Sequence, residues 1–283
     1  MPELPEVETI KRGLDNFIVH KKIKRVEVCC EKSFIGPVEV VEGAEITGLR
    51  RRGKALLIDL DTGVTMMVHL RMTGQMIYRG EEDSFAGGHP TDSFFTELPN
   101  KQTRVIFELS SGVLYFNDQR KFGFVKALLT NEVEQDKFIA SLAPEPWQMA
   151  PADFYQRLQR HKNSCIKAVL LDQKIICGLG NIYADEALYD SQIHPKRLAG
   201  SLTEEEAESL VHSACKVMDA SIDSGGSTMA TYVRADGTKG DYLEKFAQVF
   251  RREGQECRRC GGEIIKTRVA GRGTHICERC QKL

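Results

Sequence analysis

The sequence contains no long apolar run and no recognisable export signal. None of its hydrophobic stretches approaches the roughly 18 residues needed to cross a bilayer. The acidic, proline-bearing start Met1–Glu6 is unlike a signal peptide. Hydrophobic residues make up 41% of the chain and charged residues 28%, as is typical of soluble globular proteins. We therefore expect a cytoplasmic protein without a membrane partner, whose 283 residues suffice for more than one domain.

The net charge of the chain does not by itself indicate a nucleic-acid partner. Its 39 Lys and Arg nearly balance its 40 Asp and Glu, which leaves a formal charge of −1. The distribution is less even, because nine Lys and Arg accompany only four Glu from Arg251 to Leu283, and a second basic cluster spans residues 50–54. Such patches on a neutral protein are compatible with phosphate binding, although most charge runs are simply solvated surface.

Regular cysteine spacing is absent except near the end of the chain. Nine scattered cysteines in a cytoplasmic protein argue against a disulfide framework. The last four form two knuckles with the same internal spacing, Cys257-x2-Cys260 and Cys277-x2-Cys280. Four thiolates in this pattern are typical of tetrahedral zinc, and a closed set of four protein ligands leaves no position for chemistry. We predict one structural Zn²⁺ that holds a β-hairpin, with Arg272 between glycines in the hairpin.

The first half of the chain predicts one helix followed by short strands. Apolar residues recur every three or four positions over Glu6–His20, the pattern of an amphipathic helix. Two predicted hairpins follow, each made of β-branched runs around a glycine-containing turn. They pair residues 54–60 with 64–70, and 104–109 with 113–117. Residues 79–100, rich in Gly, Asp, Ser and Pro, predict a long loop.

Beyond a proline-rich segment at 143–147 the pattern becomes helical, and no internal repeat is visible. The predicted helices are 153–160, 166–172, 182–189 and 203–222. Thr203 and Glu206 form a capping box that sets the start of the last helix, and a loop is expected over 224–240.

Three domains are expected from these patterns. They are a β-rich domain at 1–130, a helical domain at 131–245 and a zinc module at 246–283. The fold class is therefore α+β.

The N-terminus offers a candidate nucleophile. Removal of the initiator Met would expose the secondary amine of Pro2. An α-amino group has a pKa of about 7.7–8.0, so a useful fraction is unprotonated at neutral pH and can attack an electrophilic carbon. Glu3 and Glu6 are adjacent, and the following helix would hold both close by. Taken alone, such a start is commonplace.

Several further segments indicate a family only when they are taken together. They are residues 2–9 (PELPEVET), 51–54 (RRGK), 69–74 (HLRMTG), 118–123 (DQRKFG), 178–186 (GLGNIYADE) and the cysteine module with Arg272. In this order, from residue 2 to residue 280, they resemble the bacterial formamidopyrimidine-DNA glycosylases. The resemblance implies an N-terminal two-sheet β-sandwich with flanking helices, a helix–two-turn–helix domain and a C-terminal four-cysteine zinc ribbon.

The resemblance also implies a bifunctional base-excision-repair enzyme. It would excise oxidised purines, such as 8-oxoguanine and formamidopyrimidines, from duplex DNA and then cut the strand by β- and δ-elimination. Pro2 would attack C1′ and form a Schiff base, Glu3 would act as general acid and base, and Glu6 would organise the site. Lys54 would contact the phosphate beside the lesion and assist proton transfer, and Arg272 would complete this set by binding a phosphate.

Met72, Arg120 and Phe122 would fill the space left by the extruded base, by the same resemblance. Arg120 would pair with the orphaned partner base and Phe122 would wedge into the stack. Without the family pattern, Met72 and Phe122 would more often be core residues. The remaining DNA contacts expected are His69, Arg104, Lys162, Lys167, Asn181 and Tyr183. The glycine-rich run before Asn181 lies between helical segments, which disfavours a dinucleotide-binding loop.

Departures from the family pattern concern DNA contacts. A Lys-His-x-His stretch is usual where this chain has residues 101–104 (KQTR), so Gln102 or Arg104 would replace the phosphate-facing histidine. Gln119 stands where a proline is usual, and Lys121 where a second arginine is usual.

Two alternative functions remain at this stage. One is an endonuclease VIII-like glycosylase for oxidised pyrimidines, against which Leu4 counts because that branch typically has glycine there. The other is a non-catalytic DNA-binding paralogue, against which the joint presence of Pro2, Glu3, Glu6 and Lys54 counts. We expect a monomer that acts on damaged double-stranded DNA in association with the nucleoid.

Overall fold

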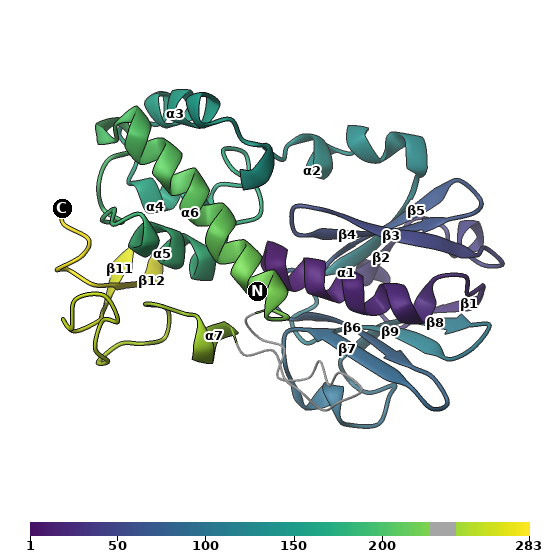
Figure 1. The fold of residues 1–283 in the computed structure, drawn as a ribbon. Helices are drawn as coiled ribbons and strands as arrows, with labels where there is room; N and C mark the ends of the chain where they lie inside the picture. The colour runs from purple at the N-terminus through teal and green to yellow at the C-terminus, as the bar shows by residue number, and fades with distance from the viewer. Residues whose placement is uncertain (227–241) are drawn as a thin grey trace. The chain divides into compact units, whose positions relative to one another are not determined.

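The computed structural model describes residues 1–226 and 242–283, which fall into two compact units (Figure 1). One unit is Met1–Ala140, together with the short described segment that begins at Ser224. The other joins Ser141–Asp223 with Tyr242–Leu283, so the predicted helical domain and zinc module form one unit. Most of the loop predicted at 224–240 lies outside the described residues. None of the described helices is both long enough and apolar enough to span a bilayer.

Two five-stranded sheets form the described N-terminal unit (Figure 1). In spatial order the first consists of β1 (Ile23–Val28), β8 (Thr103–Leu109), β9 (Val113–Asp118), β6 (Gly74–Arg79) and β7 (Ser84–Gly88). The second consists of β2 (Phe34–Ile35), β10 (Phe124–Leu129), β5 (Val64–His69), β4 (Ala55–Leu60) and β3 (Ile46–Arg52). Both predicted hairpins, β4–β5 and β8–β9, are confirmed as antiparallel pairs. One core cluster draws buried side chains from both sheets, for example Ile58 and Phe107, as the predicted sandwich requires.

Helix α1 (Leu4–Ile18) packs against β7 and β3, the edge strands of the two sheets (Figure 1). Val7, Ile10 and Leu14 are fully buried in the core, which confirms the apolar periodicity read from the sequence. The helix begins two residues before the predicted Glu6, because Glu3 and not a later residue serves as its N-cap.

The segment 79–100, predicted as a long loop or insertion, contains a regular strand. Strand β7 lies within it and pairs antiparallel with β6. A Cβ placed on Gly87 would lie 2.6 Å from Cγ1 of Ile10, and one on Gly13 would lie 2.0 Å from the Phe85 ring. Gly13 and Gly87 therefore allow α1 to approach β7 closely. In the sequence, the glycines within residues 79–100 predicted a loop.

The second unit is mainly helical and ends in a two-stranded ribbon. Its elements are α3 (Pro151–Arg160), α4 (Ile166–Leu171), α5 (Asn181–Asp190), α6 (Glu204–Asp223), α7 (Tyr242–Lys245), β11 (Ile265–Val269) and β12 (Arg272–Ile276). The capping box predicted for α6 is confirmed, since the N–H of Thr203 donates to Glu206 Oε2 over 2.9 Å and the N–H of Glu206 donates to Thr203 Oγ1 over 3.2 Å. The short helix α2 (Lys137–Ala140) belongs to the N-terminal unit.

Two adjacent acidic residues on α5 attach the cysteine module to the helices. Asp185 accepts the ammonium of Lys167 at 2.6 Å and the backbone N–H of His275 at 2.9 Å. Lys167 also donates to Thr274 Oγ1 over 2.7 Å, and its side chain is fully buried, like that of Asp185. Glu186 accepts the backbone N–H groups of residues 248–250 at 2.7–2.9 Å. Strand β12 and the chain leading into the first knuckle are therefore both held by buried carboxylates.

We expect Asp185→Asn to lower the free energy of unfolding of this unit by about 3–5 kcal/mol, because the Lys167 ammonium would remain buried without its counter-charge. Urea unfolding measures the loss. The matched control is Lys216→Met, which breaks an ion pair of similar length with Asp190, 2.8 Å, on a lysine side chain that is 70% exposed. That variant should lose less than about 1 kcal/mol. Equal losses in the two variants would contradict this account of the buried pair.

Candidate functional site

The start of α1 brings the proposed nucleophile and two carboxylates together. Pro2, Glu3 and Glu6 are all buried. The backbone N–H of Glu3 donates to Glu6 Oε2 over 2.8 Å, and the Glu3 carboxylate accepts the N–H of Glu6, which completes a capping box. Each carboxylate is thus held in place by the backbone of the other residue, directly after Pro2 in the chain.

Lys54 lies in the turn between β3 and β4, where Gly53 has a positive φ of 55°. This turn is tied to α1, because Arg51 donates to Glu8 Oε2 over 3.0 Å and to the carbonyl of Gly53 over 3.0 Å. Burial alone would raise the pKa of Glu8, but hydrogen bonds from Arg51 and Arg12 hold that pKa below its usual value. Sequence reasoning assigned no role to Glu8, since no local pattern reveals a partner 43 residues away.

His69 ends strand β5 and is 5% exposed. Burial, with the nearby charges of Arg71 and Lys54, lowers the pKa of His69 to about 3, so the ring is neutral at physiological pH. Its Nδ1 accepts the backbone N–H of Arg71 over 3.0 Å. The proton of the neutral ring therefore resides on Nε2, which leaves His69 a hydrogen-bond donor.

The residues expected to fill the void are accessible. Arg120 and Phe122 are exposed, with the Phe122 side chain 55% exposed, and Met72 is half-buried. The guanidinium carbon of Arg120 lies 4.8 Å from the centre of the Phe122 ring, within the range of a cation–π contact. Apolar residues of this kind are more often buried in the core, but Phe122 is not.

Arg104, one of the two expected replacements for a phosphate-facing histidine, is buried. It is 7% exposed, and its guanidinium donates to the carbonyls of Asp118 over 2.7 Å and Lys101 over 3.0 Å. Backbone carbonyls accept hydrogen bonds from Nε and Nη1 of Arg104, so its surroundings do not favour the expected replacement of a phosphate-facing histidine. Gln102, the other candidate, is half-buried near Thr91.

Two residues expected to contact DNA in the second unit are also buried. Lys167 is fully buried, and its three ammonium protons are directed to Asp185, Gly273 and Thr274. Tyr183 is also fully buried, and its hydroxyl lies 2.5 Å from Ser221 Oγ. Internal partners hold both side chains, which gives them structural roles in this unit.

Other expected contacts remain accessible. Lys162 is exposed, in the turn between α3 and α4. Asn181 is half-buried at the first turn of α5, where its Nδ2 donates to the carbonyl of Gly273 over 3.0 Å. Helix N-termini are suited to phosphate binding. This contact also joins the helix start to the ribbon hairpin.

Arg272 is exposed at the end of a tight hairpin turn. Ala270 and Gly271 both have positive φ, 50° and 72°, as a two-residue type I′ turn between β11 and β12 requires. Val269 pairs directly with Arg272 across the ladder. The arginine is therefore presented from a fixed backbone.

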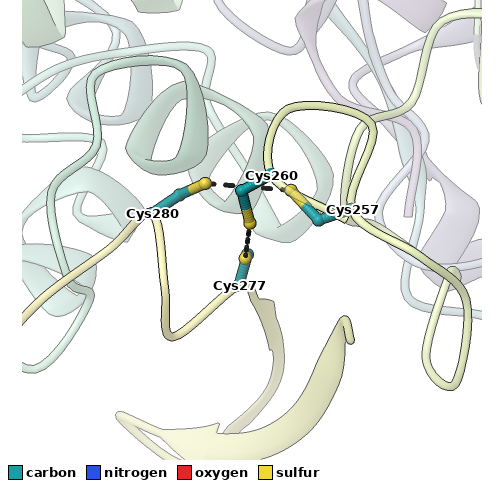
Figure 2. A group of neighbouring side chains, drawn as sticks. All are labelled: Cys257, Cys260, Cys277 and Cys280. Carbon is teal, nitrogen blue, oxygen red and sulfur yellow. Dashed lines mark hydrogen bonds between the residues drawn. The ribbon is translucent and has the colours of Figure 1, made fainter. Parts of the chain in front are cut away.

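The four cysteines converge as the sequence predicted (Figure 2). Their sulfur atoms all lie within 4.8 Å of one another, with 3.8 Å between Cys257 and Cys280 and 3.5 Å between Cys260 and Cys277. In a tetrahedral site with Zn–S bonds of about 2.3 Å, neighbouring sulfurs lie about 3.8 Å apart. The donor set and its dimensions therefore fit one structural zinc ion.

Groups around Cys257 and Cys260 are placed to support thiolates. The hydroxyl of Tyr189 lies 3.1 Å from Cys257 Sγ, and the N–H of Gly262 donates to Cys260 Sγ over 3.4 Å. Although burial opposes it, hydrogen bonds from Tyr189 and from nearby backbone N–H groups lower the pKa of Cys257 to about 6. Such outer contacts orient metal ligands and stabilise the charged sulfur.

Models of protein families match three parts of the chain. Residues 1–125 match the formamidopyrimidine-DNA glycosylase N-terminal domain, and residues 142–233 match the helix–two-turn–helix domain of the same enzymes. Residues 254–283 match the zinc finger found in these glycosylases and in isoleucyl-tRNA synthetases. The matched segments occur in the order predicted from the sequence motifs.

Whole-chain comparisons agree. The formamidopyrimidine-DNA glycosylase of Carboxydothermus hydrogenoformans is 41% identical over 290 residues, covering 100% of both chains. That of Desulfitobacterium hafniense is 39% identical over 291 residues, covering 99% of this chain and 100% of its own. A Lactococcus lactis enzyme mutant bound to DNA containing Fapy-dG superposes with a TM-score of 0.87, at 32% identity and full coverage of both chains. The chain therefore belongs to the formamidopyrimidine-DNA glycosylase family.

Proposed function

We propose that this protein removes oxidised purines from duplex DNA and then cleaves the strand at the resulting abasic site. The observation that carries the proposal is the buried start of α1, where Pro2 directly precedes two carboxylates locked by a capping box. Family membership over the whole chain supports it. An incision assay on duplexes that contain 8-oxoguanine or dihydrouracil tests it, since a purine-specific enzyme cuts the first and spares the second.

The residue roles follow from the chemistry of each group. The Pro2 amine attacks C1′, the damaged base leaves, and the opened sugar forms an iminium with the proline nitrogen. Glu3 moves protons at the sugar and Glu6 fixes Glu3 through the capping box. Lys54 neutralises the phosphate beside the lesion. Met1 must be removed first, and its side chain is 45% exposed.

Phosphate contacts are proposed for four residues of the family set, of which Lys162 and Arg272 are exposed, Asn181 is half-buried and His69 is buried. These are His69 through its neutral Nε2–H, Lys162, Asn181 and Arg272. Met72, Arg120 and Phe122 occupy the void left by the extruded base, and the Arg120 guanidinium reads the orphaned partner base. The exposure of Arg120 and Phe122 favours this assignment over a role in the core.

The substrate is an oxidised purine in this proposal and not an oxidised pyrimidine. Leu4 occupies the position that is typically glycine in the pyrimidine-specific branch, and it is fully buried at the start of α1. A Lactococcus lactis family member has been solved with DNA containing Fapy-dG, a purine lesion. We place the protein in the cytoplasm as a monomer associated with the nucleoid, where its DNA substrate lies.

Pro2→Gly should severely lower borohydride trapping of the protein on an 8-oxoguanine duplex, because a primary amine gives an imine that must be protonated before it draws electrons, whereas the proline nitrogen gives an iminium with a permanent positive charge. Protein that retains Met1 should also lose most borohydride trapping, since the Pro2 nitrogen is then an amide without an available lone pair. Mass mapping should place the wild-type adduct on the N-terminal peptide. An adduct found solely on a lysine side chain, such as that of Lys54, would contradict the assignment.

Cys257→Ser and Cys280→Ser should release zinc and weaken DNA binding while the N-terminal unit stays folded, because a structural zinc contributes folding free energy to its own module. Metal content, circular dichroism and duplex affinity measure the three effects. Cys29→Ser, which alters an exposed cysteine outside the cluster, is the control. Normal affinity and cutting by metal-free protein would show that the ribbon does not bind DNA.

Phe122→Ala should change the free energy of unfolding by no more than about 0.5 kcal/mol, as is usual for exposed positions, while excision from duplex DNA falls. The matched control is Phe116→Ala on neighbouring β9, where the ring is fully buried and its loss should cost about 3–5 kcal/mol. Arg120→Ala should also blunt discrimination by the base opposite the lesion. If Phe122→Ala destabilised the protein as much as Phe116→Ala, its ring would be a core group.

A further inference from the structure

The carboxylate of Asp118 is the centre of the loop that carries Arg120 and Phe122. Asp118 ends strand β9 and is fully buried. Its Oδ1 accepts the backbone N–H of Arg120 over 3.1 Å, and its Oδ2 accepts those of Phe122 and Gly123, both over 2.7 Å. Three N–H groups of one turn thus converge on a single buried carboxylate, which fixes the course of the turn.

The surroundings of this turn leave little freedom. Lys121 adopts a positive φ of 58°, which lets the chain curl around the carboxylate. A Cβ on Gly123 would lie 2.8 Å from Cζ of Phe116 and 2.9 Å from the carbonyl of His69. From the other side, Arg104 Nε donates to the backbone carbonyl of Asp118 over 2.7 Å. The buried Arg104 therefore braces the same residue that organises the turn.

Thr73 connects this turn to the one that carries Met72. Its hydroxyl donates to Asp118 Oδ1 and accepts the backbone N–H of Arg120 over 3.0 Å. Thr73 directly follows Met72 and precedes Gly74, which pairs with Asp118 in the β6–β9 ladder. The Met72 turn is itself closed by a hydrogen bond of 2.8 Å from Gly74 N–H to the carbonyl of Leu70. One buried hydroxyl thus bridges the two segments.

We propose that Thr73 and Asp118 are positioning residues that hold Met72, Arg120 and Phe122 as one preformed wedge before DNA arrives. The inference rests on the proposed function and deepens it. Side chains that enter a base stack must be exposed in the free protein, and exposed loops ordinarily lose conformational entropy when they bind. The hydrogen bonds of Asp118 order the backbone of this turn before DNA binds, so binding loses less conformational entropy.

The test is Thr73→Val, which removes the hydroxyl and keeps the side-chain shape, with Thr73→Ser as the rescue. The control is Thr65→Val, because the Thr65 hydroxyl is also buried and donates to a carboxylate, that of Asp59, over 2.5 Å in the other sheet. Single-turnover excision of 8-oxoguanine from a duplex is compared with cleavage of an abasic site in single-stranded DNA, which has no void to fill.

We expect Thr73→Val to lower the ratio of duplex excision to single-strand cleavage by about tenfold, which corresponds to ~1.4 kcal/mol. Thr73→Ser should restore the ratio, and Thr65→Val should leave it unchanged even if it lowers the melting temperature. Discrimination by the base opposite the lesion should fall with the duplex rate. Asp118→Asn, if it folds, should lower the ratio further, because the converging N–H groups lose their anion.

An equal ratio in Thr73→Val and Thr65→Val, with wild-type protein active on both substrates, overturns the positioning role and leaves the proposed function intact. A wild-type protein that cleaves neither substrate overturns the proposed function itself. A parallel fall of both activities in Thr73→Val shows a general structural defect and also overturns the positioning role.

Discussion

A buried carboxylate is tolerated only when hydrogen-bond donors surround it, and this requirement shapes the irregular segments of the protein. Glu6 accepts the N–H of Glu3 at the start of α1. Asp118 collects three N–H groups of the following turn, and Glu186 collects those of residues 248–250. Asp185 accepts an N–H of strand β12. Except in strand β12, which also pairs with β11, the carboxylate fixes the backbone of a segment whose shape no helix or sheet ladder would impose.

Buried cations complete this arrangement, because two of the basic residues expected to contact DNA have partners inside the protein. Lys167 neutralises Asp185, and Arg104 braces the carbonyl of Asp118. Both residue types are usual phosphate ligands, yet here their donors satisfy acceptors inside the protein. Arg120, Lys162 and Arg272 remain exposed. A protein with a formal charge of −1 would thus depend on a small number of well-placed cations.

The zinc ribbon is restrained at two separate places. A two-stranded hairpin such as β11–β12 is marginal in water on its own. The four cysteines restrain one end of the module, and the contacts of Lys167 and Asp185 with Gly273, Thr274 and His275 restrain the strand that begins at Arg272. The exposed arginine is therefore carried by a backbone held at both ends.

The sequence by itself determined the features that depend on local spacing. The periodicity of α1, the two hairpins, the Thr203–Glu206 capping box and the cysteine pairs all reflect contacts between residues close in the chain or fixed ligand geometry, and the structure confirms each. Only the tertiary structure decided which polar residues face inward. Strand β7 was not predicted because Gly87, which allows close packing against Ile10, looks like a loop residue in the sequence. Lys167 was assigned to DNA by the family resemblance, and its partners Gly273 and Thr274 lie more than a hundred residues away in the chain. The type of a residue limits which groups it can bind, but its burial and its neighbours from distant parts of the chain determine which groups it binds.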